Sequence, residues 1–168
     1  SWVLNAEVPK DYDRLDLAEH ASELSEELDL TGDGVVMLTA ASVDRHASAD
    51  DSGVIATATV GLTMPTWAAA PDGDEGGWQP GTINVFAWLP VRLSLAAMVG
   101  AVGTVTEAKV QALIESGVRG SGTASDAVCV ACPAGGTVEP FAGVRSEWGA
   151  RLARAVHAAV QTGAAARS

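Results

Sequence analysis

Three short polar clusters stand out in a chain that is otherwise rich in small apolar residues. They read Gly81-Thr-Ile-Asn84, Thr106-Glu-Ala-Lys109 and Gly120-Ser-Gly-Thr-Ala-Ser-Asp126. Between them they carry a side-chain amide, two carboxylates, an amine and several hydroxyls. Such groups can hold an oxyanion, move a proton and position a water or hydroxyl nucleophile. These residue types therefore favour a hydrolytic or small-molecule site.

The first two clusters also have structural interpretations. Thr82 and Asn84 are two residues apart, so on a strand they share one face and could simply hydrogen-bond at the strand end. Glu107 stands three residues after Thr104, which is the spacing of a helix capping box. Lys109 is the only lysine after residue 10 and falls in an apolar helix, which indicates that it meets a buried acid.

The third cluster is a loop of small residues that leads into a strand. Its glycines permit close backbone approach, and its hydroxyls stand beside the carboxylate of Asp126. It lacks the Gly-Lys-Ser/Thr ending of a nucleotide-binding P-loop and precedes a strand instead of a helix. Both the P-loop and the dinucleotide-binding fingerprint are therefore excluded.

Alternating and helical patterns predict the elements that position these clusters. Strands are expected over residues 1–8, 34–41, 54–62, 81–88 and 126–132, and helices over 13–28, 94–116 and 146–161. The helix over 94–116 is either continuous or broken at Gly103. The apolar strand over 34–41 is expected to be central and to join the next strand through a hairpin loop over 44–52. The order β-α-β-β-β-α-β-α predicts one α/β domain over residues 1–168, a mixed sheet covered by helices.

Charge and hydropathy limit the classes of partner that this chain is expected to bind. The formal net charge is −11, and the arginines are scattered along the chain, which argues against binding to nucleic acid or an anionic membrane. The longest weakly charged stretch, residues 93–106, is shorter than the ~20 residues of a membrane-spanning helix. No signal peptide is recognisable, so a cytoplasmic location is expected.

Cys129 and Cys132 form a C-x-x-C within the last predicted strand. Residues three apart on a strand point to opposite faces, so the two sulfurs should diverge. We therefore expect two buried small apolar side chains, and neither a metal site nor a redox pair.

The clusters, in this order and spacing, resemble the CbiZ-type adenosylcobinamide amidohydrolase family over nearly the whole chain. In the loop cluster, Ser121 and Ser125 replace threonines that the family usually carries, which keeps both hydroxyls. Family members usually carry a further segment before the first motif. The matching motifs are Asn5-Ala-Glu-Val8, Gly34–Ala41, Ala56–Gly61, Pro80–Asn84, Thr106–Lys109, Gly122–Ala127 and Ala142-Gly143.

The resemblance implies hydrolysis of the amide that joins the propionyl arm of the corrin ring to aminopropanol, giving adenosylcobyric acid. The cobalt corrinoid is then the substrate, and no separate cofactor is expected. Asp126 or Glu107 is expected to act as general base on water or on the Thr123 hydroxyl. Asn84, with loop backbone N–H groups, would hold the oxyanion. Lys109 would orient a carboxylate or assist the leaving group.

Substrate contacts are expected from the polar and small residues of the motifs and from two tryptophans in the long irregular stretch over 63–80. The tryptophans could lie against the flat corrin or serve only in packing. These residues are Asn5, Thr39, Thr82, Gly122, Ser125, Trp67 and Trp78.

Other functions stay open from the sequence alone. The chain could be a non-catalytic corrinoid-binding module, a hydrolase of another amide, or a structural domain. A homo-oligomer and an association with the family's N-terminal segment are also open. Ser1 could use its own α-amine as a base, as in self-processed hydrolases, but removal of methionine or cloning explains it more simply.

Overall fold

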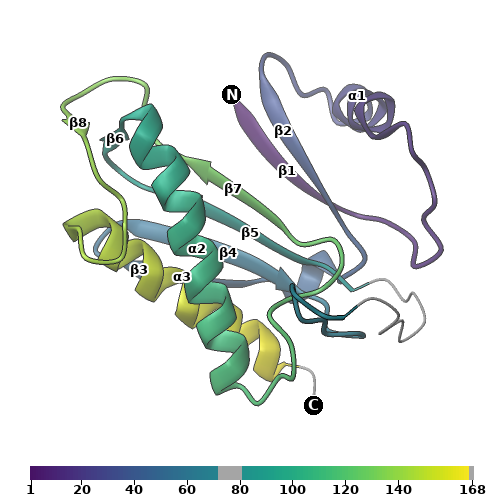
Figure 1. Ribbon diagram of the computed structural model, residues 1–168. Helices are drawn as coiled ribbons and strands as arrows, with labels where there is room; N and C mark the ends of the chain where they lie inside the picture. The colour runs from purple at the N-terminus through teal and green to yellow at the C-terminus, as the bar shows by residue number, and fades with distance from the viewer. Residues whose placement is uncertain (72–80, 167–168) are drawn as a thin grey trace.

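The computed structural model describes residues 1–71 and 81–166, and its main elements follow the predicted order (Figure 1). The strands are β1 (Trp2–Glu7), β2 (Gly34–Thr39), β3 (Ala47–Asp51), β4 (Val54–Val60), β5 (Ile83–Trp88), β6 (Arg92–Leu93), β7 (Ala127–Ala131) and β8 (Val138–Glu139). The helices are α1 (Leu17–Glu27), α2 (Leu95–Glu115) and α3 (Glu147–Ala165), with a 3-10 turn at Val43–Arg45. The predicted α/β class is confirmed, with β3, β6 and β8 added to the predicted order.

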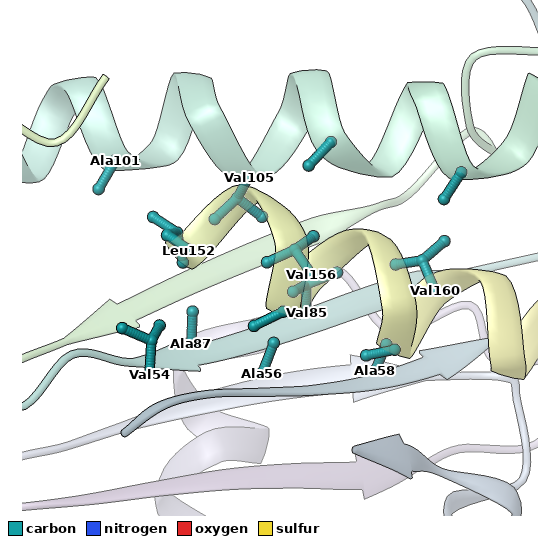
Figure 2. Packing of buried hydrophobic residues seen from close by; sticks show 14 of the residues in the cluster. Val54, Ala56, Ala58, Val85, Ala87, Ala101, Val105, Leu152, Val156 and Val160 are labelled. Carbon is teal, nitrogen blue, oxygen red and sulfur yellow. The ribbon is translucent and has the colours of Figure 1, made fainter. Parts of the chain in front are cut away.

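The main sheet has the strand order β3-β4-β5-β7. It is mixed, because β3, β4 and β5 are antiparallel neighbours whereas β5 and β7 are parallel. Helices α2 and α3 cover one face of this sheet (Figure 1). Figure 2 shows the core between them, in which alternate strand residues meet the helices. Its labelled members include Val54, Ala56, Ala58, Val85, Ala87, Val105, Leu152, Val156 and Val160.

Small residues allow the helices to approach the sheet closely. Ala56 and Ala58 of β4 are fully buried. Gly163 of α3 faces the same strand, and a Cβ added there would lie 2.6 Å from Val60 Cγ2. Replacement of this glycine would therefore push α3 off the sheet.

Helix α2 runs without a break through Gly103, so the continuous alternative is correct. The Ser94 side chain caps it by accepting from the Ala97 N–H at 3.0 Å, as its position predicts. Thr104 lies in the middle of the helix, and its hydroxyl donates to the Ala142 carbonyl at 2.8 Å. A capping box at Thr104 and Glu107 is therefore wrong.

The strand predicted to be central is not central. β2 pairs in parallel with β1 in a separate two-stranded sheet. The predicted hairpin loop over 44–52 instead contains β3, which forms the hairpin with β4 through Ser52 and Gly53, both at positive φ. The polar sequence of β3 has no strand pattern of its own. The segment is extended because it pairs with β4, so the sequence did not predict it.

Strand β1, helix α1 and strand β2 form an N-terminal unit beside the face of the main sheet that α2 and α3 leave open (Figure 1). The amphipathic helix predicted over 13–28 begins only at Leu17, and no residue of α1 is buried. Leu15, which lies within the predicted range but outside the helix, is 95% exposed. The helix therefore leaves much of its apolar surface uncovered.

Cys129 and Cys132 are free and half-buried, so their burial is less complete than predicted. Burial raises the pKa of the Cys129 thiol. The Cys132 sulfur accepts from the Leu93 N–H at 3.4 Å. No group of three or more potential metal-ligating side chains occurs within the described residues. The described helices likewise include none with the length and apolar character needed to cross a membrane.

Candidate active site

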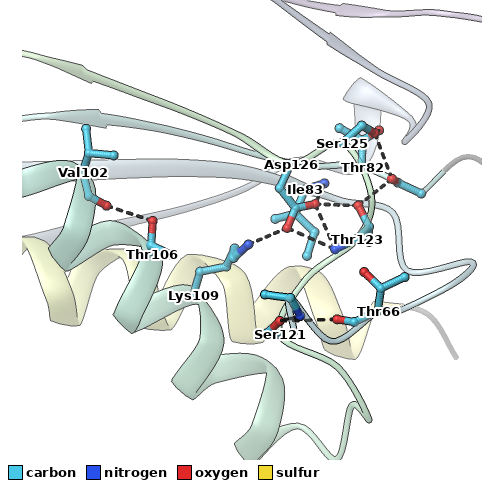
Figure 3. A network of polar contacts seen from close by, with 12 residues as sticks. Thr66, Thr82, Ile83, Val102, Thr106, Lys109, Ser121, Thr123, Ser125 and Asp126 are labelled. Atoms are coloured by element: carbon cyan, nitrogen blue, oxygen red, sulfur yellow. Dashed lines mark hydrogen bonds and ion pairs between the residues drawn. The ribbon is translucent and has the colours of Figure 1, made fainter. Parts of the chain in front are cut away.

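Asp126 lies at the centre of a polar cluster where the loop over 119–126 enters β7 (Figure 3). Its Oδ1 accepts from the backbone N–H of Ile83 at 2.9 Å. The Thr123 N–H lies 3.2 Å from both carboxylate oxygens. Oδ2 forms an ion pair with Nζ of Lys109. The carboxylate is thus held simultaneously by β5, α2 and its own loop.

The Lys109–Asp126 pair is almost buried, with side-chain exposures of 9% and 12%. The prediction that this lysine meets a buried acid is confirmed. Desolvation makes such a pair costly to break, because loss of one partner leaves the other charge buried without compensation. The pair therefore fixes α2 against the loop that carries the hydroxyl groups.

Hydroxyl groups connect the loop to the strand cluster around residue 81. Thr123 Oγ1 lies 2.5 Å from Asp126 Oδ1 and 2.5 Å from the Gly81 carbonyl oxygen, and its single proton can serve only one at a time. Ser125 donates to the same carbonyl at 3.2 Å and lies 2.9 Å from the Thr82 hydroxyl. These hydroxyl groups join the first and third polar clusters, and the Lys109–Asp126 pair joins the second cluster to them.

Gly122 makes room for the ion pair. A Cβ at this position would overlap Asp126 Oδ2 and lie 2.7 Å from Lys109 Nζ. Gly122 is buried, and the charged pair occupies the space that a side chain would take. The glycine therefore leaves no open space for a substrate at this point. The predicted substrate contact at Gly122 stays a prediction, whereas its role in the packing of the cluster is clear.

Residues 66–68 form hydrogen bonds with the same loop. Thr66 and Gly122 form an isolated antiparallel bridge, in which the Thr66 N–H donates to the Gly122 carbonyl at 2.8 Å. The Ser121 N–H donates to the Thr66 carbonyl, and the Ser121 hydroxyl accepts from the Ala68 N–H, both at 2.8 Å. Trp67, between these partners, is 51% exposed. The sequence contains no signal for this bridge.

Next to the cluster is a cavity of about 460 Å³ that the N-terminal unit closes on one side. Thr39, Thr82 and Ser125, three of the predicted substrate contacts, all line it. Thr39 is 1% exposed, and its hydroxyl accepts from the Ala41 N–H at 3.1 Å. The structure therefore brings these three hydroxyl-bearing residues to one cavity, which adjoins Asp126 through Ser125 and Ala127 but is not lined by Asp126 itself.

Asn84 occupies a different position from the one its predicted role needs. Its Nδ2 donates to Asn5 Oδ1 at 2.8 Å and to the Leu38 carbonyl at 2.9 Å. Asn5 in turn donates to the Thr59 hydroxyl at 3.1 Å. Both amide protons of Asn84 are thus used, and its free atom, the buried Oδ1, is an acceptor. In this conformation Asn84 cannot donate to an oxyanion, and with Asn5 it links the two sheets instead.

The remaining predicted residues lie elsewhere. Glu107 is exposed on the outer side of α2, where it lines a separate groove of about 700 Å³. It does not meet the Asp126 cluster, because Lys109, two residues on, points the other way. Trp67 lies on the segment bridged to Gly122, and Trp78 lies outside the described residues.

Backbone groups are the part of the site that sequence reasoning missed. The Ile83 N–H holds the carboxylate of Asp126, and the Gly81 carbonyl oxygen lies within hydrogen-bond distance of the Thr123 and Ser125 hydroxyls. Both belong to the motif around Thr82, so the motif itself was the available signal. Side-chain chemistry alone could not reveal that its backbone makes these contacts.

Comparisons with known proteins agree with the family that the motifs resemble. The family model for adenosylcobinamide amidohydrolase matches residues 1–168. A protein of that name from Halobacterium salinarum is 35% identical over 136 residues, which cover 77% of this chain and 58% of that protein. Another from Methanosarcina mazei is 29% identical over 171 residues, covering 96% of this chain and 82% of that protein.

The match thus spans little more than half the length of the Halobacterium protein. No solved structure matches the chain. The family predicted from the motifs is confirmed, and its description names the predicted amide hydrolysis. The chain therefore belongs to the adenosylcobinamide amidohydrolase family.

Proposed function

We propose that this chain hydrolyses the secondary amide of adenosylcobinamide. Water adds across the bond, giving adenosylcobyric acid and the free amine of aminopropanol. Support comes from the family and from the names of the two relatives. The structural observation that carries the proposal is the buried Lys109–Asp126 pair, in contact with Thr123 and beside a cavity of suitable chemistry.

Hydrolysis of an amide requires an activated nucleophile, a stabilised oxyanion and a protonated leaving amine. In this proposal Asp126 is the general base, because its Oδ1 already lies 2.5 Å from the Thr123 hydroxyl. The base acts either on that hydroxyl or on a water in its place. Lys109 holds the carboxylate in position and supplies a proton toward the leaving nitrogen.

The oxyanion needs donors other than Asn84. The hydroxyls of Thr82 and Ser125 line the cavity and lie one residue from the groups that contact or carry the base. We assign this role to the Thr82 hydroxyl, because the Ser125 proton is donated to the Gly81 carbonyl, together with backbone N–H groups of the loop. Thr39 lines the same cavity, and we propose that it contacts the substrate without taking part in the reaction.

The test uses two acids that the sequence alone could not rank. Purified chain is incubated with adenosylcobinamide, and adenosylcobyric acid is measured by mass spectrometry. Asp126→Asn should lower kcat by about 100-fold or more, since a lost general base typically costs ~10²–10⁴-fold. Glu107→Gln should stay within about threefold of the unmodified chain, because Glu107 is exposed and outside the cluster.

Asp126→Asn leaves the charge of Lys109 uncompensated, so the variant could lose activity because it fails to fold. A second variant separates the two effects. Thr123→Val keeps the ion pair and removes only the hydroxyl. It should reduce turnover strongly if that hydroxyl is the nucleophile and modestly if water is. Unchanged turnover in Asp126→Asn would contradict the proposed base.

The chief alternative is a non-catalytic corrinoid-binding module. It predicts corrinoid binding by the unmodified chain with no product. In the proposal the cobalt corrinoid is substrate, no further cofactor takes part, and the location is cytoplasmic, in keeping with the two free thiols. A homo-oligomer and an additional N-terminal segment also stay predictions.

A further inference from the structure

The cavity beside Asp126 is built by two parts of the chain that are distant in sequence. One wall comes from α1 and β2 of the N-terminal unit, including Leu17, Ala21 and Val36. The other wall lies at the start of β5 and β7, including Thr82 and Val128. Among the described residues that line it there is no charged side chain. The cavity is therefore suited to an uncharged ligand.

Apolar side chains on the N-terminal wall are left open. Leu17 is 54% exposed and Val35 is 47% exposed, and both line the cavity. The adjoining helix α1 has no buried residue. Covering these groups would remove apolar surface from water, at about 25 cal/mol per Å². An apolar occupant would gain most of its affinity on this wall.

The cavity adjoins the reacting groups through Thr82 and Ser125, while Lys109, Thr123 and Asp126 are not among the residues that line it. The Ser125 hydroxyl lines it and donates to the Gly81 carbonyl, which the Thr123 hydroxyl also contacts. Thr123 in turn contacts the carboxylate of Asp126. A ligand in the cavity thus lies next to the polar cluster, and the hydroxyls form the border between its apolar and reacting parts.

We propose that this cavity binds the ring-bearing, acyl side of the corrinoid and not the amino alcohol that leaves. This inference rests on the proposed function and specifies how the same site holds its substrate. Cavities that enclose a drug-sized ligand measure ~300–1,000 Å³, and this one measures about 460 Å³. Aminopropanol, with a handful of heavy atoms, would leave it largely empty. A complete adenosylated corrinoid would exceed it, so one uncharged edge of the ring enters.

The test narrows the cavity from α1 without touching the polar cluster. Ala21 is half-buried and lines the cavity, whereas Ala18 lies three residues earlier, is exposed and does not line it. Ala21→Phe should raise KM about tenfold or more with kcat within about threefold, which is the signature of lost uniform binding. Ala18→Phe is the matched control and should change neither value. Circular dichroism verifies that both variants are folded.

Inhibition identifies which side of the substrate the cavity holds. Adenosylcobyric acid, which lacks the amino alcohol, should inhibit the unmodified chain competitively and lose affinity in Ala21→Phe by the same factor as KM. Free aminopropanol should show no such loss. An unchanged KM in Ala21→Phe, or a loss confined to aminopropanol, would overturn the assignment.

Direct binding separates this inference from the proposed function. If the unmodified chain yields no product, adenosylcobyric acid is titrated while its visible absorbance is followed. Weaker binding by Ala21→Phe than by Ala18→Phe would support the cavity even though hydrolysis had failed. Equal binding by the two variants would overturn the cavity whatever the turnover.

Discussion

The two sides of the main sheet are organised differently. On one side α2 and α3 bury large parts of their surface, and the side chains of Ser94 and Ser146 cap their first turns. On the other side α1 buries no residue and has no side-chain cap. Its N-cap residue Asp16 is hydrogen-bonded to Arg14 instead, which lowers the pKa of the Asp16 carboxyl to about 2.

Under the proposed function, this difference separates stability from substrate recognition. The packed side supplies the rigid support for the Lys109–Asp126 pair, since Lys109 comes from α2. The N-terminal unit supplies a wall of the cavity and keeps apolar side chains in contact with solvent. An enzyme that holds its reacting groups on a rigid body can place its binding wall on a looser one.

The largest expected difference between the two sides is in the cost of truncating a leucine. Leu152 in α3 is fully buried, and Leu152→Ala should lower the free energy of unfolding by about 3 kcal/mol, within the usual ~2–5 kcal/mol. Leu17 in α1 is 54% exposed, and Leu17→Ala should cost less than about 1 kcal/mol. Urea denaturation monitored by circular dichroism measures both. Equal losses would show that the N-terminal unit is as tightly packed as the core.

A smaller effect is expected at the link between the sides. Asn84→Ala removes the bonds to Asn5 and to the Leu38 carbonyl and leaves both acceptors unpaired, which should cost ~1–3 kcal/mol. Hydrogen exchange should then accelerate in β1 and β2 more than in β4. Uniform acceleration over the whole chain would mean that the N-terminal unit does not open separately.

The smallest expected effect concerns two glycines of the packed side, one with free space beside it and one in close contact with the sheet. Gly103 lies in α2, and a Cβ added there would meet no atom within 4 Å. Gly103→Ala should therefore stabilise the chain by about 0.5–1 kcal/mol through helix propensity. Gly163→Ala is the matched contrast, because its Cβ would lie 2.6 Å from Val60 Cγ2 and should destabilise. Stabilisation by both changes would contradict the close contact of α3 with the sheet.

The long elements of the fold follow from local patterns, whereas the pairing of strands does not. Periodicity identified α2 and α3, and Ser94 and Ser146 mark where each begins. The apolar run of β2 suggested a central strand, yet it pairs only with β1 among the described strands. The polar strand β3 escaped detection because its extended form depends on β4.

One part of the candidate site was predictable, because a charged side chain in an apolar helix needs an oppositely charged partner. A single lysine in an apolar helix has to find an acid, and Lys109 finds Asp126. Once Lys109 faces inward, Glu107 must face outward, because the two are about 200° apart around the helix. The role of Asn84 could not be predicted, since its partners Asn5 and Leu38 belong to a separate sheet.

The bridge between Thr66 and Gly122 has an optical consequence. Thr66 and Ala68 both bond to Ser121, so the half-exposed indole between them, Trp67, shares the position of the loop. Any event that displaces the loop displaces this ring and changes its contact with solvent. Trp67 is one of five tryptophans in the chain, and its share of the emission reports on the backbone beside the carboxylate of Asp126.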